Sequence, residues 1–224
     1  MSFILNIETA TKNCSVAIAK NGETILCKEI AEEGYSHAEK LHVFIEEVIA
    51  EAKINVHDLV AVAVSQGPGS YTGLRIGVSA AKGLCYALGI PLIAVDTLQT
   101  LASQVNFKDG LIVPMLDARR MEVYSSILNS KLKIIREVQA QIITEDSFNE
   151  YKEIIYFVGD CADKCKPVLT KENFIFLEEI KYPSAKDMSK ISYDKYQTKD
   201  IVDMAYFEPY YLKDFMITTS AKNK

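Results

Sequence analysis

Residues Ser65–Gly77 read SQGPGSYTGLRIG, and the rest of the chain is organised around this stretch. The apolar run Leu59–Val64 before it predicts a buried β-strand. Three glycines and a proline then force a tight turn, because glycine adopts backbone conformations that other residues resist. Thr72 is expected to cap a helix that continues to about Leu88. A strand, a glycine turn and a helix N-terminus together form a typical anion seat, which here comprises Gly67, Pro68, Gly69, Ser70 and Thr72.

The glycine turn does not match the common nucleotide-binding motifs. A P-loop requires a Lys-Ser or Lys-Thr pair after the closing glycine, and no such pair follows Gly73. The spacing of Gly67, Gly69 and Gly73 also differs from Gly-x-Gly-x-x-Gly. The turn therefore either contacts a nucleotide weakly or joins the strand to the helix without a ligand, and the residue pattern leaves both interpretations open.

The helix after the turn is unusually rich in small residues, with Gly73, Gly77 and Gly83 in its interior and Ala80 and Ala81 between them. Each interior glycine costs about 1 kcal/mol relative to alanine, so close packing must offset the cost. Small residues four positions apart lie on one helix face and let another backbone approach. Either the helix packs tightly on the protein's own sheet, or it forms an interface with another subunit.

The first half of the chain reads as hairpin strands followed by alternating helices and strands. Asn21-Gly22 between two alternating apolar runs is a strong hairpin signal. The expected strands are Phe3–Thr9, Cys14–Lys20, Glu23–Ile30, Leu59–Val64 and Pro91–Asp96, and the expected helices are Ser36–Lys53, Thr72–Leu88 and Thr97–Gln104. Ser36 and Glu39 fit a capping box, and Gly89 is placed to end its helix. This order predicts an α/β fold with a mixed sheet flanked by helices.

The second half echoes this order and begins at the polar stretch 106–110. We expect strands at Leu111–Leu116, Val123–Leu128, Leu132–Ile143 and Ile154–Val158, and helices at Thr144–Glu150 and Ser184–Gln197. The predicted organisation is an N-terminal subdomain, 1–105, carrying the glycine turn and the partner helices, and a smaller C-terminal subdomain, 106–224. The end of the chain is expected to pack back on the first subdomain.

Composition and charge exclude several classes of function. The formal net charge is −5, which argues against binding of nucleic acid by the chain alone, since phosphate neutralisation needs a basic excess. The five cysteines are scattered, and no apolar run reaches the roughly 18 residues that span a bilayer. We therefore expect a cytoplasmic protein without a metal centre, a disulfide framework or a membrane segment.

Few residues suggest catalysis. His37 and His42 are five positions apart on the expected helix, which is not the spacing of metal ligands, so both are interpreted as solvated. Glu8 ends the first strand beside Thr9 and Thr11 and could face a ligand. No nucleophile with a partnering base stands out in the sequence.

Several segments resemble the TsaB family, formerly called YeaZ. The similarity lies in NIETATKNCSVAI at Asn6–Ile18, SHAEKL at Ser36–Leu41, GPGSYTGLRIG at Gly67–Gly77, PLIAVDTL at Pro91–Leu98, DARRMEVY at Asp117–Tyr124 and EPYYLK at Glu208–Lys213. The resemblance is dense over roughly the first 125 residues and sparse afterwards. It is strongest in the glycine-turn motif.

The resemblance implies the duplicated fold of actin, sugar kinases and chaperone ATPases, which is ribonuclease H-like, with a reduced second half. It also implies a role in making threonylcarbamoyladenosine beside the anticodon of tRNA. In that pathway the metal-binding paralogue TsaD transfers the threonylcarbamoyl group, and the ATPase TsaE assists. TsaB is the non-catalytic scaffold, which pairs with TsaD or with itself and meets tRNA only within the complex.

For this chain the resemblance implies an interface at Leu41, Phe44, Ile45, Val48, Gly73, Gly77, Ala80 and Ala81. The two metal-binding histidines of TsaD correspond to Thr97 and Leu101, so the metal centre is expected to be absent. We expect no required cofactor, although weak ATP or ADP contact at the glycine turn stays open within the complex. The alternatives are an autonomous nucleotide hydrolase or kinase of the same superfold and, with the least support, a metallopeptidase.

Overall fold

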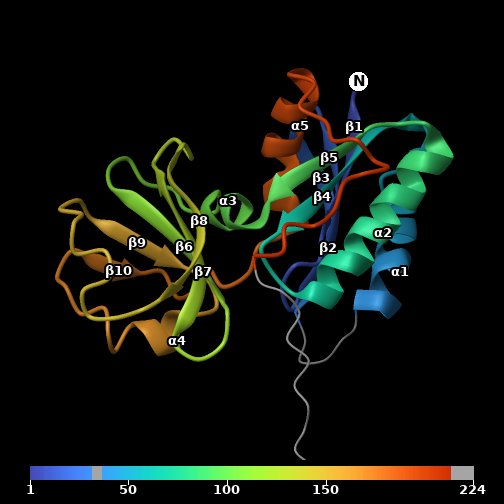
Figure 1. Cartoon of the computed structure of the whole chain (residues 1–224). Helices are drawn as coiled ribbons and strands as arrows, with labels where there is room; N and C mark the ends of the chain where they lie inside the picture. Colours follow the sequence, from blue (N-terminus) through green and yellow to red (C-terminus); the bar gives the residue numbers. More distant parts are fainter. Residues whose placement is uncertain (32–36, 213–224) are drawn as a thin grey trace, which may run out of the picture.

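The computed structural model describes residues 1–31 and 37–212, which form two five-stranded mixed sheets (Figure 1). The first sheet has the order β3-β2-β1-β4-β5. Its strands are β1 Phe3–Glu8, β2 Asn13–Lys20, β3 Glu23–Ala31, β4 Leu59–Gly67 and β5 Leu92–Asp96. β1, β2 and β3 are antiparallel neighbours, whereas β1, β4 and β5 run parallel to one another. The predicted hairpin turn is confirmed, with φ of 52° at Asn21 and 88° at Gly22.

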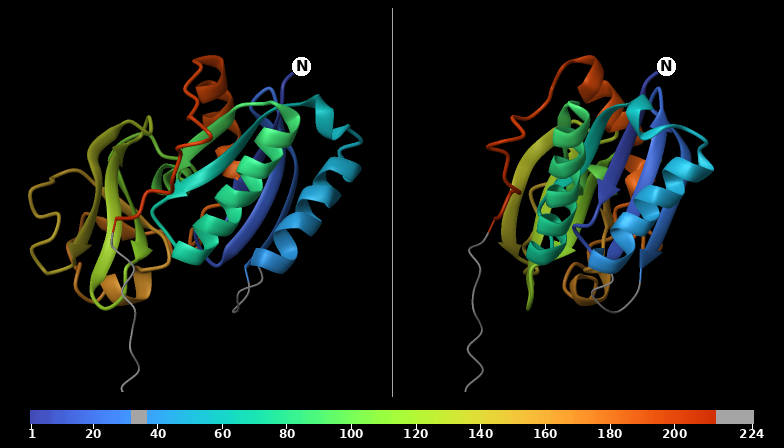
Figure 2. Two further views of the ribbon diagram at one scale, coloured as in Figure 1. Left: turned by 45° about the vertical axis from the view of Figure 1, so that its right-hand side comes forward. Right: turned by 90° about the vertical axis from the view of Figure 1, so that its right-hand side faces the viewer.

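Helices cover both faces of the first sheet. The helices α1 His37–Glu51 and α2 Tyr71–Leu88 lie side by side on one face, where Leu41, Val48 and Val78 join the core (Figure 2). The opposite face is covered by the 3-10 turn η2 Ala185–Met188 and by α5 Ser189–Gln197, which come from the far end of the chain. A short 3-10 turn, η1 Val56–Asp58, precedes β4.

The second sheet repeats the plan of the first. Its order, β8-β7-β6-β9-β10, is again three antiparallel strands followed by two parallel ones. Its strands are β6 Leu111–Asp117, β7 Glu122–Asn129, β8 Ile134–Ile142, β9 Ile155–Val158 and β10 Phe174–Phe176. The last two strands and the helix α4 Ala162–Cys165 are short, so the second half is reduced. The predicted duplicated α/β fold with mixed sheets is confirmed.

The two halves exchange covering helices. The helix α3 Thr97–Ala102 precedes the stretch where a boundary was expected, but Leu98 and Leu101 pack on Ile112 and Leu128 of the second sheet. Conversely, Ala185 and Met188 follow the second sheet and pack on the first. Each sheet therefore uses a helix that lies on the other side of the expected boundary at 105/106.

Three details differ from the sequence-based expectations. Residues 145–150 form turns instead of the predicted helix, because Phe148 takes φ of 65° so that its ring can enter the second core. The predicted helix Ser184–Gln197 is divided into η2 and α5. The strand β10 was not predicted, because three residues carry too little alternation to be recognised.

Other expectations concern membrane spans, the start of α1 and the cysteines. None of the helices in the described residues is long and apolar enough to cross a membrane. The capping box expected at Ser36 falls outside the described residues. The five cysteines are free thiols, and four of them are buried like small hydrophobic side chains.

Candidate functional site

The glycine turn connects the end of β4 to the start of α2. Gly67 has φ of 110°, a conformation that favours glycine. Ser70, and not the predicted Thr72, caps α2: its Oγ accepts the N–H of Gly73 at 3.2 Å. Thr72 lies one residue inside the helix and is exposed. The cap prediction was wrong because a Ser-x-Thr pair offers two candidate hydroxyls, and only the three-dimensional turn selects one.

Three backbone donors of the turn are bonded within the chain. The Gly67 N–H donates to Thr97 Oγ1 at 3.2 Å, and the Ser70 N–H donates to the Ala10 carbonyl at 2.7 Å. The Gly73 N–H is taken by the Ser70 cap. Pro68 has no N–H to offer. In the anion seat expected from the sequence, the N–H groups of Gly67 and Ser70 are therefore already occupied.

Two further segments cover the turn. A Cβ added at Gly69 would lie 2.3 Å from the Ala10 carbonyl oxygen, so the loop after β1 presses against the turn. From the other end of the chain, the Tyr210 N–H donates to the Gln66 carbonyl at 2.7 Å. The ring of Tyr211 lies 4.9 Å from that of Tyr71. The end of the described chain thus forms a strap over the glycine turn.

Gly73 and Gly77 face the interior. A Cβ on Gly73 would lie 2.1 Å from the Thr9 carbonyl oxygen, and one on Gly77 would lie 2.3 Å from Thr9 Oγ1. Thr9 Oγ1 also donates to the Gly73 carbonyl at 2.8 Å. Close packing on the protein's own first sheet therefore explains both glycines, the plainer of the two interpretations. Gly83 differs, because its Cβ would meet no atom within 4 Å.

The outer surface between α1 and α2 forms a groove of 640 Å³. It is lined by Ala38, His42, Ile45, Arg75, Ile76, Ser79, Ala80, Gly83 and Leu84. Val43 and Tyr86 on the same two helices are large and exposed, at 46% and 81%. An open groove lined by small residues, on two helices that also expose large apolar side chains, is typical of a helix–helix contact surface.

The eight interface residues predicted from the sequence divide into two groups. Leu41, Ile45, Val48, Gly73, Gly77 and Ala81 are buried within this chain, where they pack α1 and α2 onto the sheet. Phe44 and Ala80 are only partly buried, and Ala80 lines the groove together with Ile45. Contact of a partner with these helices stays a prediction. It now rests on the residues that line the groove.

Glu8 is a fully buried carboxyl at the end of β1. Its Oε1 accepts the Ala10 N–H at 2.6 Å, whereas Oε2 has no hydrogen-bond partner in the described chain. Burial is the main cause that raises its pKa to about 7, against the lowering effect of the Ala10 amide. Because the side chain is 0% exposed, it lies in the interior and not at an open ligand site.

The positions expected to have lost metal ligands are structural. Thr97 is fully buried and its hydroxyl holds the glycine turn, while Leu101 belongs to the core of the second half. Among residues 1–31 and 37–212, no three His, Cys, Asp or Glu side chains are grouped to hold a metal ion. The interpretation of His37 as solvated was wrong: it is buried, with Nε2 2.8 Å from the Thr11 carbonyl oxygen. His42 is exposed, as expected.

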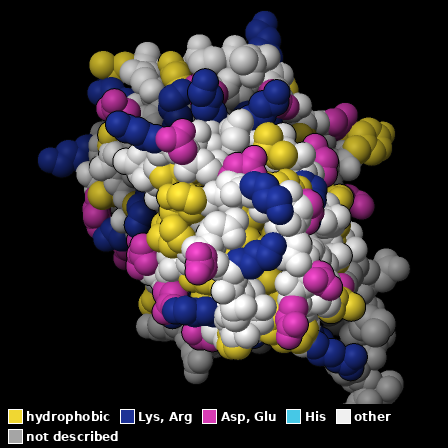
Figure 3. Space-filling model, turned by 90° about the vertical axis from the view of Figure 1, so that its left-hand side faces the viewer, with side chains coloured by type: hydrophobic (Ala, Val, Ile, Leu, Met, Phe, Trp, Pro, Cys, Tyr) yellow, Lys and Arg dark blue, Asp and Glu magenta, His cyan; other side chains and the backbone are white. Residues whose placement is uncertain are grey.

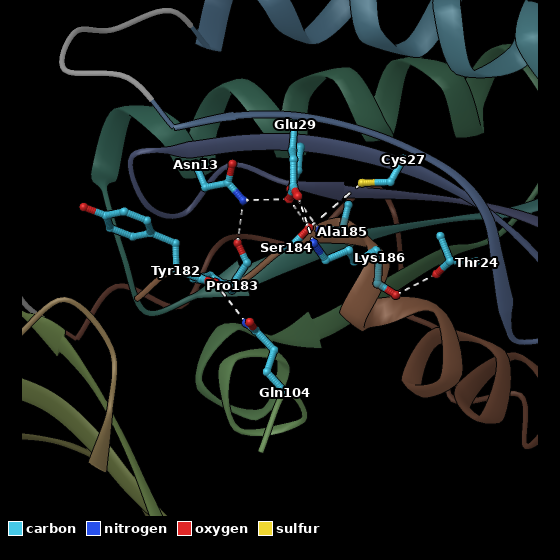
Figure 4. Close-up of polar contacts among 11 residues, drawn as sticks. Asn13, Thr24, Cys27, Glu29, Gln104, Tyr182, Pro183, Ser184, Ala185 and Lys186 are labelled. Atoms are coloured by element: carbon cyan, nitrogen blue, oxygen red, sulfur yellow. Dashed lines mark hydrogen bonds and ion pairs between the residues drawn. The ribbon is translucent and has the colours of Figure 1, made fainter. Parts of the chain in front are cut away.

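A polar cluster, which we call the clasp, ties the returning chain to the first sheet (Figure 4). Glu29 pairs with Lys186 at 2.8 Å and accepts the Ser184 hydroxyl at 2.6 Å. Asn13 donates to Glu29 at 3.3 Å and to the Pro183 carbonyl at 3.0 Å. Burial acts to raise the pKa of Glu29, but these partners outweigh it and lower that pKa. The clasp borders a shallow cavity of 390 Å³.

Sequence reasoning missed the clasp and did not identify the residues that the returning strap contacts, because the partners are far apart in the chain. Asn13 and Pro183 are separated by 170 positions, and Arg75 and Tyr211 by 136. A single sequence carries no pairing signal across such distances. A partial hint was the EPYYLK segment near the C-terminus, which includes both strap tyrosines.

Comparison with known proteins gives a consistent result. Residues 29–211 match the family described as "TsaD: tRNA N6-adenosine threonylcarbamoyltransferase". The "tRNA threonylcarbamoyladenosine biosynthesis protein TsaB" of Buchnera aphidicola subsp. Schizaphis graminum is 33% identical over 195 residues, which cover 83% of this chain and 90% of that protein.

Solved structures share the fold. The structure described as YeaZ from Pseudomonas aeruginosa has a TM-score of 0.84 at 22% identity, covering 95% of this chain and all of that one. The activator of the 2-hydroxyisocaproyl-CoA dehydratase from Clostridium difficile, with ADPNP bound, has a TM-score of 0.50 at 11% identity, covering 90% of this chain and 98% of that one. The sequence-based expectation of an actin-like and sugar-kinase-like fold is thereby confirmed.

Proposed function

Since this chain belongs to the TsaB (YeaZ) family, whose role lies in tRNA threonylcarbamoyladenosine biosynthesis, we propose that it is the non-catalytic subunit of the transferring complex. In this role it pairs with a TsaD-like catalytic subunit and works with a TsaE-like ATPase. It meets tRNA only as part of that complex, and the complex is cytoplasmic. When alone, the chain pairs with a second copy of itself through the same surface.

The observation that carries this proposal is the groove between α1 and α2. It is open and lined mainly by small and apolar residues, and the same two helices expose Val43 and Tyr86 to water in the isolated chain. Gly83 and Ala80 let a partner helix approach closely at its centre. Burial of such a surface against a paired helix supplies the hydrophobic free energy that holds two subunits together.

The buried residues at the expected metal-ligand positions and the bonded glycine turn favour a non-catalytic role over a catalytic one. Leu101 is a core residue, and the Thr97 hydroxyl accepts a hydrogen bond from the glycine turn. Two further backbone N–H groups, those of Ser70 and Gly73, donate to Ala10 and to the Ser70 side chain. We propose that the chain requires no cofactor of its own. Any contact of ATP or ADP with the turn is weak and depends on the assembled complex, because Tyr210 and Tyr211 cover the turn in the isolated chain.

An autonomous nucleotide hydrolase or kinase is less well supported. Such an enzyme needs an exposed carboxylate at the first strand to hold a metal ion and orient water. Glu8 is the carboxylate at that position, and it is fully buried. Measurement of ATP hydrolysis by the purified chain tests this alternative directly, since brisk turnover without partners would favour it.

The decisive experiment is threonylcarbamoyl transfer to tRNA with purified partners, with and without this chain. The matched variants are Gly83→Leu, which fills the groove without touching the core, and Lys190→Leu, which alters the exposed part of α5. We expect Gly83→Leu to abolish co-purification with the TsaD-like subunit and to reduce transfer to the level seen without the chain. Lys190→Leu should behave like wild type. Full activity of Gly83→Leu, or transfer that does not need the chain, would refute the proposal.

The position of Gly77 makes it unsuitable as an interface probe. A large residue there collides with Thr9 inside the chain, so loss of pairing would report damage to the fold. Gly83 avoids this problem. A circular dichroism melt of each variant confirms that the fold is intact before pairing is measured.

A further inference from the structure

The turn between β6 and β7 carries two arginines in a conformation that arginine disfavours. Arg119 has φ of 72° and Arg120 has φ of 53°, both in the left-handed region. The turn is closed by the Glu122 N–H, which donates to the Arg119 carbonyl at 3.2 Å. Asn and Gly adopt such positive φ angles most readily, and the chain uses Asn21-Gly22 where β2 turns into β3. The arginine pair therefore stands where the backbone alone would select other residues.

The backbone of the turn is held without help from the arginine side chains. Lys164 on α4 donates to the Arg120 carbonyl at 2.8 Å and to the Glu122 carbonyl at 2.7 Å, and it pairs with the Asp117 carboxylate. Asp117 Oδ1 also accepts the Arg119 N–H at 2.9 Å. Lys164 and Asp117 thus hold the backbone of the strained turn, and its geometry does not require the guanidinium groups.

The two guanidinium groups are free within the described chain. Both arginines are exposed, and neither forms an ion pair with any residue of 1–31 or 37–212. Neither lines the groove between α1 and α2 or the cavity beside the clasp. Strain kept at an exposed site, with side chains that do nothing for the fold, is a mark of a binding function.

We propose that Arg119 and Arg120 bind the phosphodiester backbone of RNA. The inference rests on the proposed function, in which this chain belongs to a complex that acts on tRNA. Guanidinium forks bind phosphate oxygens in bidentate geometry, and two neighbouring forks can hold successive phosphates. A small nucleotide is usually held in a concave site, whereas this turn projects openly, which suits an extended polyanion.

The surroundings explain why the contact is local. On the face shown in Figure 3, acidic and basic side chains are interspersed and form no broad basic patch. With a net charge of −5, the chain has no general attraction for nucleic acid. Two unpaired arginines on a rigid turn can still fix the position of an RNA that the rest of the complex holds. In Figure 1 the turn lies beside α4, at the same end of the molecule as the start of α2.

The test replaces the pair by residues that the turn prefers, in the double variant Arg119→Asn/Arg120→Gly. The control, Lys131→Gln/Lys133→Gln, removes two positive charges at the turn between β7 and β8. Binding of an unmodified tRNA transcript is measured against salt concentration for the complex with its partners, assembled with wild-type or variant chain. Log K falls as log salt rises, and each lost phosphate contact makes this slope less steep by about 0.9. Each lost contact also lowers the affinity roughly tenfold at about 0.1 M salt.

We expect the arginine variant to lose one to two contacts by this measure and to melt no lower than wild type, while the lysine control keeps the wild-type slope. An unchanged slope would overturn the inference, as would a defect in partner association without RNA or a loss confined to ADP binding. If transfer needs no subunit of this kind, the proposed function fails, yet the salt slopes measured in the presence of the partners still decide the inference. If transfer needs the chain but the arginine variant matches wild type, only the inference fails.

Discussion

Replacement of Gly77 by alanine should destabilise this protein, although the same change at Gly83, on the same helix, should stabilise it. Both changes remove an interior glycine, which favours the helix by about 1 kcal/mol. At Gly83 nothing lies within 4 Å of the new Cβ, so that gain is realised. At Gly77 the new Cβ would lie 2.3 Å from Thr9 Oγ1, so Thr9 must move.

The cost at Gly77 follows from what Thr9 does. Its hydroxyl donates to the Gly73 carbonyl at 2.8 Å, and loss of a buried hydrogen bond costs about 1 kcal/mol. Overpacking of a dense interior adds about 1–3 kcal/mol. After subtraction of the helix gain, Gly77→Ala should lower the free energy of unfolding by about 1–3 kcal/mol. The two variants should therefore differ by about 2–4 kcal/mol.

Equilibrium unfolding in urea, with an unchanged m-value, measures this difference. The control is a double-mutant cycle with Thr9→Ala, which removes the colliding hydroxyl: in that background Gly77→Ala should cost much less. Equal unfolding free energies for Gly77→Ala and Gly83→Ala would show that the close approach of Thr9 does not determine the need for glycine at position 77.

Three further outcomes are expected. Ser70→Ala should lower the free energy of unfolding by about 1 kcal/mol through loss of the helix cap, whereas Thr72→Ala should change it little, as thermal melts would show. Glu8 has a pKa of about 7 in the folded state against 4.5 as its ordinary value, so the folded chain binds the extra proton between these values and stability falls as pH rises from about 4.5 to 7. Glu8→Gln should remove about 3 kcal/mol of that decline in urea titrations at several pH values, and an unchanged pH profile would contradict the assignment. Glu29→Gln should destabilise the chain by about 1–2 kcal/mol, because the clasp loses the negative charge that pairs with Lys186 and one of two acceptor oxygens. Lys190→Gln, at an exposed ion pair, should have almost no effect in the same assay.

Local patterns were sufficient for most of the elements. Alternation and the Asn21-Gly22 turn identified the first hairpin, and the apolar run before the glycine turn identified β4. These signals are strong because each residue's neighbours in sequence are also its neighbours in space. The helix predicted at Thr144–Glu150 was wrong for the opposite reason. Its polar residues suit a helix, but the packing of Phe148 into the core of the second half determines the backbone there.

The candidate site was less predictable than the fold. The sequence drew attention to the glycine turn and to the small-residue helix, but it could not assign the glycines to faces. The contact of Gly77 with Thr9 depends on the loop after β1, whereas the Cβ position of Gly83 is open. His37 was misjudged in the same way, because the Thr11 carbonyl that receives it lies 26 positions away.

The exchange of covering helices between the two halves has a consequence for synthesis on the ribosome. The first sheet is complete in sequence at Asp96, but the face formed by Ile4, Ala17 and Ile93 is covered by residues of η2 and α5, beginning with Ala185. These residues emerge about 90 positions later, which at roughly 5–20 residues per second is a delay on the order of 5–20 s. Throughout that interval the nascent chain displays one bare apolar sheet face. Its first half can therefore reach its final packing only after nearly all of the second half has been made.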